Sequence, residues 1–162
     1  MSRGQFRRVL VGWDCSAGAA AALLAAAAIA DGAEKRVVAL AVLRPVPRGE
    51  SEEEQAAEMA AMRHQAEESF RIARDALPGA AQAGVTLEFA ESPDTARTLC
   101  EYADTHVFGL IALGRHGAGS ILRPRLGHVA EAVAKKSNVP LLLLGSRGLG
   151  NRQAGQNKVW CC

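Results

Sequence analysis

Apolar runs alternate with helical patterns along the chain. Five short runs, rich in β-branched residues or leucine, are typical of strands and cover residues 7–13, 36–43, 85–91, 107–113 and 139–145. The second run is apolar at nearly every position, which indicates a strand covered on both faces, as in a parallel sheet. The third run, VTLEFAE, alternates between apolar and polar residues and therefore predicts a strand at a sheet edge.

The segments between these runs carry helix signals. Ser16 is the expected N-cap of an alanine-rich helix to about Ala30, and Ser51 with Glu54 forms a capping box for a helix that continues to about Leu77.

Two more helices are predicted in the second half of the chain. Ser92 and Pro93 are the expected cap and first residue of a helix toward His106, and a last helix runs from about Gly127 to Ser137. The resulting alternation predicts the fold class: a single-domain, doubly wound α/β protein. Its five-stranded parallel sheet is expected in the order 3-2-1-4-5, with helices on both faces.

Length and composition agree with one globular domain. The 162 residues are expected to form a domain over residues 1–145 and a flexible tail over 146–162, which has no hydrophobic periodicity. A net charge of +2 and 4% aromatic residues argue against nucleic acid as a partner. The alanine-rich run at 17–30 is too short to span a bilayer, so no membrane association is expected.

The cysteines and the first residues bear on location. Cys15, Cys100, Cys161 and Cys162 show no C-x-x-C spacing, which fits reduced thiols and a cytoplasmic protein. Basic residues ahead of an apolar stretch resemble a secretory signal, but Asp14 interrupts that stretch and argues against one.

A ligand crevice is expected where the loops after the first and fourth strands diverge. Asp14 follows the first strand, and a glycine-rich loop begins at Gly114 after the fourth. Gly114 and Gly117 are expected to adopt positive φ and to let the backbone approach a ligand. Gly127 and His128 open a helix whose free N–H groups attract phosphate.

The charged residues around this crevice fit a mononucleotide. Arg115, Arg123 and Arg125 can neutralise phosphate, although the last two equally fit a solvated surface loop. Asp14 can accept hydrogen bonds from an adenine amino group or a ribose hydroxyl. Ser120 stands where a P-loop requires lysine, and Leu122 stands where a dinucleotide motif requires glycine, so both motifs are excluded.

Three motifs together resemble the universal stress protein family, in particular its ATP-binding members. These are VLVGWDCS at the first strand, G-x-x-G-x9-G from Gly114 through Gly117 to Gly127, and the closing VPLLLL. The resemblance covers nearly everything from Arg7 to Gly145. It implies ATP, or ADP or AMP, as ligand, a homodimer formed through the fifth strand, and a role in stress response without well-defined catalysis.

The resemblance also implies roles for individual residues. Asp14 is expected to hold the adenosine end, Val42 to border the adenine, and the glycine loop to surround ribose and phosphates. The complete set of expected nucleotide-binding residues is Gly12, Asp14, Val42, Gly114, Arg115, His116, Gly117, Gly127, His128 and Val129.

One departure from the family pattern leaves alternatives open. The family continues after the last glycine with Ser or Thr, whereas this chain has His128, which is bulkier and depends on pH. If that side chain fills the phosphate position, the protein is a nucleotide-free interaction module. A slow ATP hydrolase or nucleotidyl transferase is the enzymatic alternative, but residues 114–128 contain no Asp or Glu. No catalytic residue or protein metal ligand is predicted, and Mg²⁺ is expected only on the phosphates.

Three residues near the crevice also have structural explanations. Asp14 can serve as a helix cap, alone or with Ser16. Trp13 is expected to be core packing rather than a wall of the pocket. Cys15 fits a small apolar filler better than a reactive thiol.

Overall fold

The computed structural model describes residues 6–30, 34–46, 51–116 and 126–145. Its single sheet has the predicted order β3-β2-β1-β4-β5, and all four strand pairs are parallel. The strands are β1 (Arg8–Gly12), β2 (Arg36–Leu43), β3 (Val85–Glu91), β4 (Leu110–Gly114) and β5 (Leu141–Leu144). The helices are α1 (Ala17–Ile29), α2 (Glu52–Asp75), α3 (Gly79–Gln82), α4 (Thr95–Thr105) and α5 (His128–Lys136).

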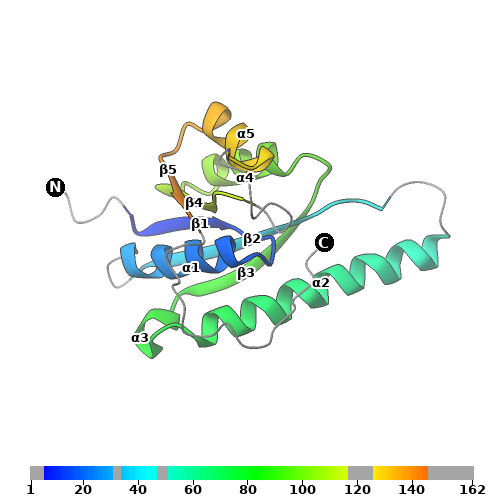
Figure 1. Ribbon diagram of the computed structural model, residues 1–162, viewed down its shortest axis with the longest axis horizontal. Coiled ribbons are helices and arrows are strands. Elements are labelled where there is room, and N and C mark those ends of the chain that lie inside the picture. Colours follow the sequence, from blue (N-terminus) through cyan, green and yellow to red (C-terminus); the bar gives the residue numbers. More distant parts are fainter. Residues whose placement is uncertain (1–5, 31–33, 47–50, 117–125, 146–162) are drawn as a thin grey trace.

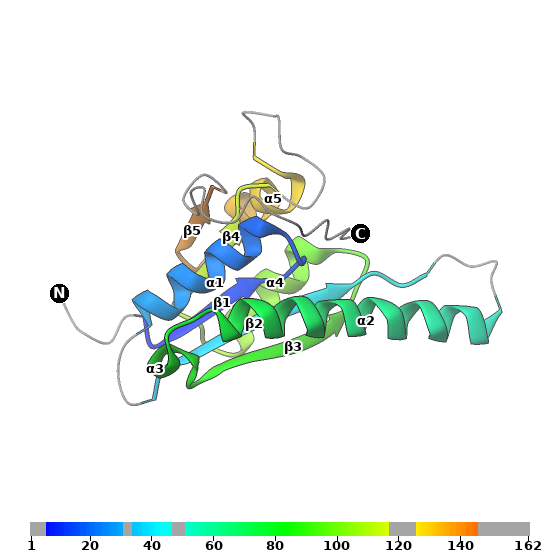
Figure 2. The same cartoon turned by 60° about the horizontal axis from the view of Figure 1, so that its bottom comes forward.

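The helices cover both faces of the sheet, as predicted. Alternate residues of each strand point to opposite faces, so Val9 and Val11 of β1 pack with α1 and α2, while Leu10 packs with α4 and α5. Figures 1 and 2 show α1 and α2 on one side of the sheet and α4 and α5 on the other. Both faces of the central strands are therefore buried, which explains the continuous apolar run of β2.

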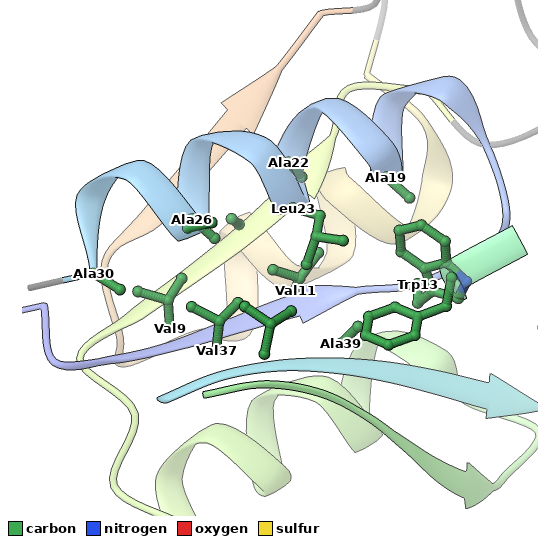
Figure 3. Close-up of a cluster of buried hydrophobic side chains, with 14 of the residues drawn as sticks. Val9, Val11, Trp13, Ala19, Ala22, Leu23, Ala26, Ala30, Val37 and Ala39 are labelled. Atoms are coloured by element: carbon green, nitrogen blue, oxygen red, sulfur yellow. The ribbon is translucent and has the colours of Figure 1, made fainter. Parts of the chain in front are cut away.

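Alanine lets α1 lie close to the sheet. Ala19, Ala22 and Ala26 are almost completely buried against β1 and its neighbours (Figure 3). Ser16 caps the helix as predicted, because its Oγ accepts a hydrogen bond from the backbone N–H of Ala19 at 3.1 Å. Larger side chains are poorly tolerated at these alanine positions, since they must displace a strand or the helix.

Helix α2 is the longest helix and packs on the sheet along only part of its length. The capping box of Ser51 and Glu54 opens it, as predicted. Only Ala66 and Phe70 of α2 are fully buried. The amino-terminal half projects beyond the carboxyl ends of the strands (Figures 1 and 2).

The predicted start of α4 was wrong. Asp94, not Ser92, is the N-cap, and its carboxylate accepts from the backbone N–H of Arg97 at 3.0 Å. The Ser92 hydroxyl instead accepts from the N–H of Asp94 at 3.2 Å, so it positions the residue that caps the helix. The hydrogen bonds from Arg97 and from Lys136 lower the pKa of the Asp94 carboxyl, since both favour its charged form.

The predicted fourth strand begins later than residue 107. Val107 has a positive φ of +55°, in the left-handed region, and its N–H donates to the carbonyl of Asp104. The N–H of Phe108 donates to the carbonyl of Ala103, which completes a Schellman motif at the end of α4. Valine rarely takes this conformation, so no residue preference predicted it.

One prediction about the fold falls outside the described residues, and one element of the structure was not predicted. The tail predicted at 146–162 lies outside them, and the short helix α3 was not anticipated. Among the described segments, no helix has both the length and the apolar character needed to cross a membrane.

Tyr102 of α4 is held between the sheet and the helix end. Its hydroxyl donates to Glu88 of β3, which also pairs with Arg36 at 2.8 Å. The Tyr102 ring stacks on His106 with centroids 4.0 Å apart. Burial raises the pKa of Tyr102 to about 12, and the bond to Glu88 adds to that shift, because both disfavour the phenolate.

We expect the phenol of Tyr102 to titrate near pH 12 in the folded protein and near pH 10, the ordinary value, in denaturant. Because the folded-state pKa is raised, the associated stabilisation is complete below pH 10 and is lost as the pH rises through 12. Tyr102 is the only tyrosine of the chain, so phenolate absorbance reports on it alone. Equal midpoints in both states would contradict the burial and bonding described above.

Candidate functional site

A cleft of about 710 Å³ opens at the carboxyl ends of β1, β2 and β4, the position expected for a doubly wound sheet. Its size lies within the usual range for small-molecule sites. Eight of the predicted site residues line it: Gly12, Asp14, Val42, Gly114, Arg115, Gly127, His128 and Val129.

Asp14 lies on the cleft wall and is exposed. Its Oδ1 accepts from the backbone N–H of Ser16 at 3.0 Å, so it supports the N-cap residue of α1 while Ser16 does the capping. Cys15 between them has φ +63°, which turns the chain sharply at this point. A carboxylate accepts up to about four hydrogen bonds, so the bond to Ser16 leaves capacity for a ligand hydroxyl or amino group.

The positive φ predicted for Gly114 was wrong. Gly84 is the only glycine with positive φ among the described residues, so Gly114 does not adopt the predicted conformation. A Cβ built on Gly114 lies 2.8 Å from the carbonyl carbon and 2.9 Å from the Cα of Gly18 in α1. Glycine is required here because the end of β4 touches the backbone of α1.

Gly12 is also closely packed, but against side chains rather than backbone. A Cβ at this position overlaps Cδ2 of Leu113 and lies 3.4 Å from Cδ1 of Leu99. At these two glycines the ends of β1 and β4 pack closely on Leu113 and on α1, and these strand ends form the floor of the cleft.

The opposite wall of the cleft is the start of α5. Gly127 is its N-cap and makes no side-chain cap bond, and its N–H donates to the carbonyl of Arg115 at 2.7 Å. The N–H of Arg115 in turn donates to the carbonyl of Leu144 at 2.8 Å, which ties this wall to β5. The next three N–H groups, of His128, Val129 and Ala130, belong to the first helical turn and have no partner within the helix, where the first bond is from Glu131 to Gly127. An anion is favoured at such a helix end.

Two predicted residues are not placed on the cleft. His116 is described but does not line it, and its carbonyl oxygen lies 3.3 Å from a Cβ built on Gly18. Gly117, Arg123 and Arg125 lie outside the described residues. The roles assigned to these four residues remain predictions.

Helix α2 supplies a wall that the sequence did not reveal. Met62, Gln65 and Ala66 line the cleft together with Trp13. Trp13 is packed as predicted, with 5% of its surface exposed and its ring edge-on to Phe70 at a centroid distance of 5.7 Å. It lines the cleft as well, so packing and contact with a ligand are compatible.

Other lining residues were also missed. They come from the ends of β1, β2 and β4 and the positions just after them, from α4 and from α5: Cys15, Leu40, Ala41, Leu43, Arg44, Thr95, Leu99, Leu113 and Ala130. Most are apolar, and their position at strand ends is the signal that would have found them.

The charges on the wall favour an anionic ligand with a hydroxyl-bearing part. Among the described lining residues, Asp14 is the single acidic one, while Arg44 and Arg115 are basic. No group of three His, Cys, Asp or Glu side chains suited to a metal ion occurs in the described part of the chain. The geometry defines an α/β protein with a cleft that is lined by one carboxylate, two arginines, the first N–H groups of α5 and many apolar side chains.

The chain belongs to the universal stress protein family, whose model matches residues 5–145. This match confirms the resemblance seen in the sequence, and it leaves the ligand to be established. No curated protein sequence matches the chain.

Solved structures of the family share the fold. The universal stress protein UspA from Lactobacillus plantarum aligns with a TM-score of 0.74 and 21% identity over 85% of this chain and 96% of that one. A universal stress protein from Burkholderia pseudomallei gives 0.64 and 22% over 86% and 96%. A universal stress protein in complex with cAMP gives 0.58 and 19% over 86% and 97%.

Replacing Gly114 by Ala should lower the free energy of unfolding by about 1–3 kcal/mol, since the new methyl group must displace backbone rather than a flexible side chain. Chemical denaturation measures the change. Gly79→Ala is the matched control, because no atom lies within 4 Å of a Cβ built there, and it should be close to neutral. Equal stabilities of the two variants would contradict the contact between β4 and α1.

Proposed function

We propose that this universal stress protein binds an adenine nucleotide, ATP or its products, and acts as a stress-response regulator or sensor. The observation that carries the proposal is the single cleft that joins Asp14 after β1 to Val42 of β2 on one side and to Arg115 and the start of α5 on the other. A carboxylate suits ribose or adenine, an apolar surface suits the base, and helix N–H groups with arginine suit phosphates. One solved relative of the same fold is a complex with cAMP, which is an adenine nucleotide.

His128 is compatible with this proposal. Its side chain is exposed on the wall, and the cleft keeps its volume of about 710 Å³ beside it. A histidine ring nitrogen donates a hydrogen bond to phosphate in place of the Ser or Thr hydroxyl of the family pattern. This favours nucleotide binding over the alternative of an empty interaction module.

The scarcity of acid–base groups on the described wall favours binding over catalysis. Asp14 is the one carboxylate among the described lining residues, and the proposal assigns it to the sugar and base. Phosphoryl transfer requires metal ions and a group that positions the nucleophile, and the described wall offers no carboxylate near the start of α5 for either task. Mg²⁺ then accompanies the ligand, held by its phosphates.

Asp14→Ala should weaken ATP binding about ten- to hundredfold, because a hydrogen bond to a charged group contributes about 1.5–3 kcal/mol. Calorimetry measures the dissociation constant. Asp14→Asn keeps an acceptor for Ser16 and for one ligand hydroxyl, so its loss should be smaller.

Asp75→Ala is the control for a carboxylate outside the cleft, since Asp75 pairs with Arg71 on the exposed side of α2. Its affinity should equal that of the wild type. Unchanged affinity in Asp14→Ala would remove the assigned role of Asp14, and no binding by the wild type would remove the proposed function.

We also propose a homodimer formed through β5. This strand is at the edge of the sheet, and its leucines Leu141–Leu144 are only half-buried within one chain. An unpaired apolar edge readily joins a second strand. The cytoplasm is the proposed location, supported by Cys100, which is buried as a free thiol rather than in a disulfide.

Sedimentation velocity at micromolar concentration should show a dimer of about twice the 17.0 kDa chain mass. The unpaired strand edge is the physical reason for this expectation. A single monomeric species over the full concentration range would contradict it without affecting the nucleotide proposal.

A further inference from the structure

We propose that nucleotide binding in the cleft is coupled to the uptake of a proton by His128, so that the affinity for nucleotide rises as the pH falls. This inference rests on the proposed function and adds regulation by pH to the same site. The charged ring of His128 holds the phosphates by a charge-assisted hydrogen bond, which is about twice as strong as a neutral one.

The main chain fixes His128 at the end of the cleft that is proposed for phosphate. His128 is the first residue of α5 and lines the cleft directly after the N-cap, Gly127. The N–H of Gly127 donates to the carbonyl of Arg115 at 2.7 Å, and the carbonyl of Gly127 accepts from the N–H of Glu131 at 2.9 Å. The backbone at residue 128 is therefore held from β4 and from the helix, beside free N–H groups that favour an anion.

The His128 side chain is available to a ligand. It is exposed, and in the part of the chain that the structure describes it has neither a hydrogen-bond partner nor an ion-pair partner. His106, by contrast, stacks on the ring of Tyr102 and lies 3.0 Å from its carbonyl oxygen. An imidazole ring donates from both nitrogens once it is protonated, so His128 then has two donors to offer to phosphate.

Charged and titratable side chains stand on every element around the start of α5. They are Asp14 after β1, Arg44 after β2, Asp94 and Arg97 at the start of α4, Arg115 and His116 after β4, and Glu131, Lys135 and Lys136 of α5.

Most carboxylates among these groups already have a basic partner. Glu131, one turn after His128, pairs with Lys135 at 2.8 Å. Asp94 lies 3.6 Å from Lys136 and also caps α4. Asp14 lies on the wall beyond β1, and the proposed function assigns it to the sugar and base. A positive charge at a helix N-terminus beside arginine is disfavoured, so the free site gives a protonated His128 little stabilisation.

A bound phosphate changes this balance, because it supplies the missing negative charge. Histidine side chains ordinarily change charge between about pH 5 and pH 8, so a nearby anion favours the protonated ring within this range. Coupling between two ligands is reciprocal, and the proton therefore strengthens nucleotide binding by the factor by which the nucleotide strengthens proton binding. The Ser or Thr of the family pattern has no such change of charge, so the coupling follows from the histidine of this chain.

Calorimetry with ATP at about pH 6 and about pH 8 tests the coupling. The ratio of the two dissociation constants should be about five- to tenfold larger in the wild type than in His128→Ser, because only the wild type gains a charge-assisted bond at the lower pH. Both proteins bind the same ATP, so the titration of its own phosphate cancels in the comparison. His128→Gln keeps a neutral donor and should show the same pH dependence as His128→Ser.

Proton uptake is the second measurement. Binding enthalpies near neutral pH in two buffers with different ionisation enthalpies give the number of protons bound with each ATP. The wild type should take up more protons than His128→Ser, by up to about one for each ATP. Adenosine has no phosphate, so its affinity should depend on pH equally in the two proteins.

His64→Ser is the matched control. His64 is exposed on α2 and does not line the cleft, so this variant should keep the pH dependence of the wild type. Circular dichroism at both pH values checks that every variant is folded.

The outcomes separate this inference from the proposed function. If the wild type binds ATP at neither pH, the proposed function fails. If the wild type binds ATP with the pH dependence and proton uptake of His128→Ser, the role of His128 fails while nucleotide binding stands. A difference between the two proteins that is as large for adenosine as for ATP also overturns that role, since the ring then acts away from the phosphates.

Discussion

The cleft depends on the position of β1 between β2 and β4. The chain passes from β1 outward to β2 and β3, then returns across the sheet to pair Val9 of β1 with Leu110 of β4. The loops that follow β1 and β4 therefore leave the sheet edge in different directions. Asp14 and Arg115, 101 positions apart in sequence, line one cavity because of this single pairing.

Close backbone contact at the cleft limits which residues the strand ends tolerate. Gly114 touches the backbone of Gly18, so this glycine is needed to bring helix and strand together before any ligand is considered, whereas Gly12 faces the side chain of Leu113. A glycine in a nucleotide motif can therefore be required for two separate reasons: close approach of the ligand to the backbone, or close contact between two backbone segments of the protein. For Gly114 the second explanation is sufficient, which a spacing motif alone does not reveal.

The sheet order and most helix boundaries followed from the sequence, because buried parallel strands are continuous apolar runs and caps such as Ser16 and Ser51 act locally. Local sequence signals did not locate the ends of α4. Ser92 and Asp94 were both possible N-caps, and Val107 replaces the glycine that usually follows a helix. Eight of the ten candidate residues line the cleft, but the α2 wall was missed. Its anchor joins Trp13 and Ser69 across 56 positions, and no local pattern encodes such a contact.

The two halves of the cleft differ in how freely their sequences can change. Gly114 touches the backbone of α1, so a side chain at this position disturbs the fold. On α2 the core contacts are made by Ala66 and Phe70, whereas Met62 and Gln65 line the cleft and are only partly buried. The bond from Trp13 to Ser69 and the contact of Arg63 with Phe89 hold α2 on the sheet. The cleft therefore joins a wall whose positions are limited by backbone contact to a wall that is held by side-chain contacts, and the second wall can change in sequence without moving a strand.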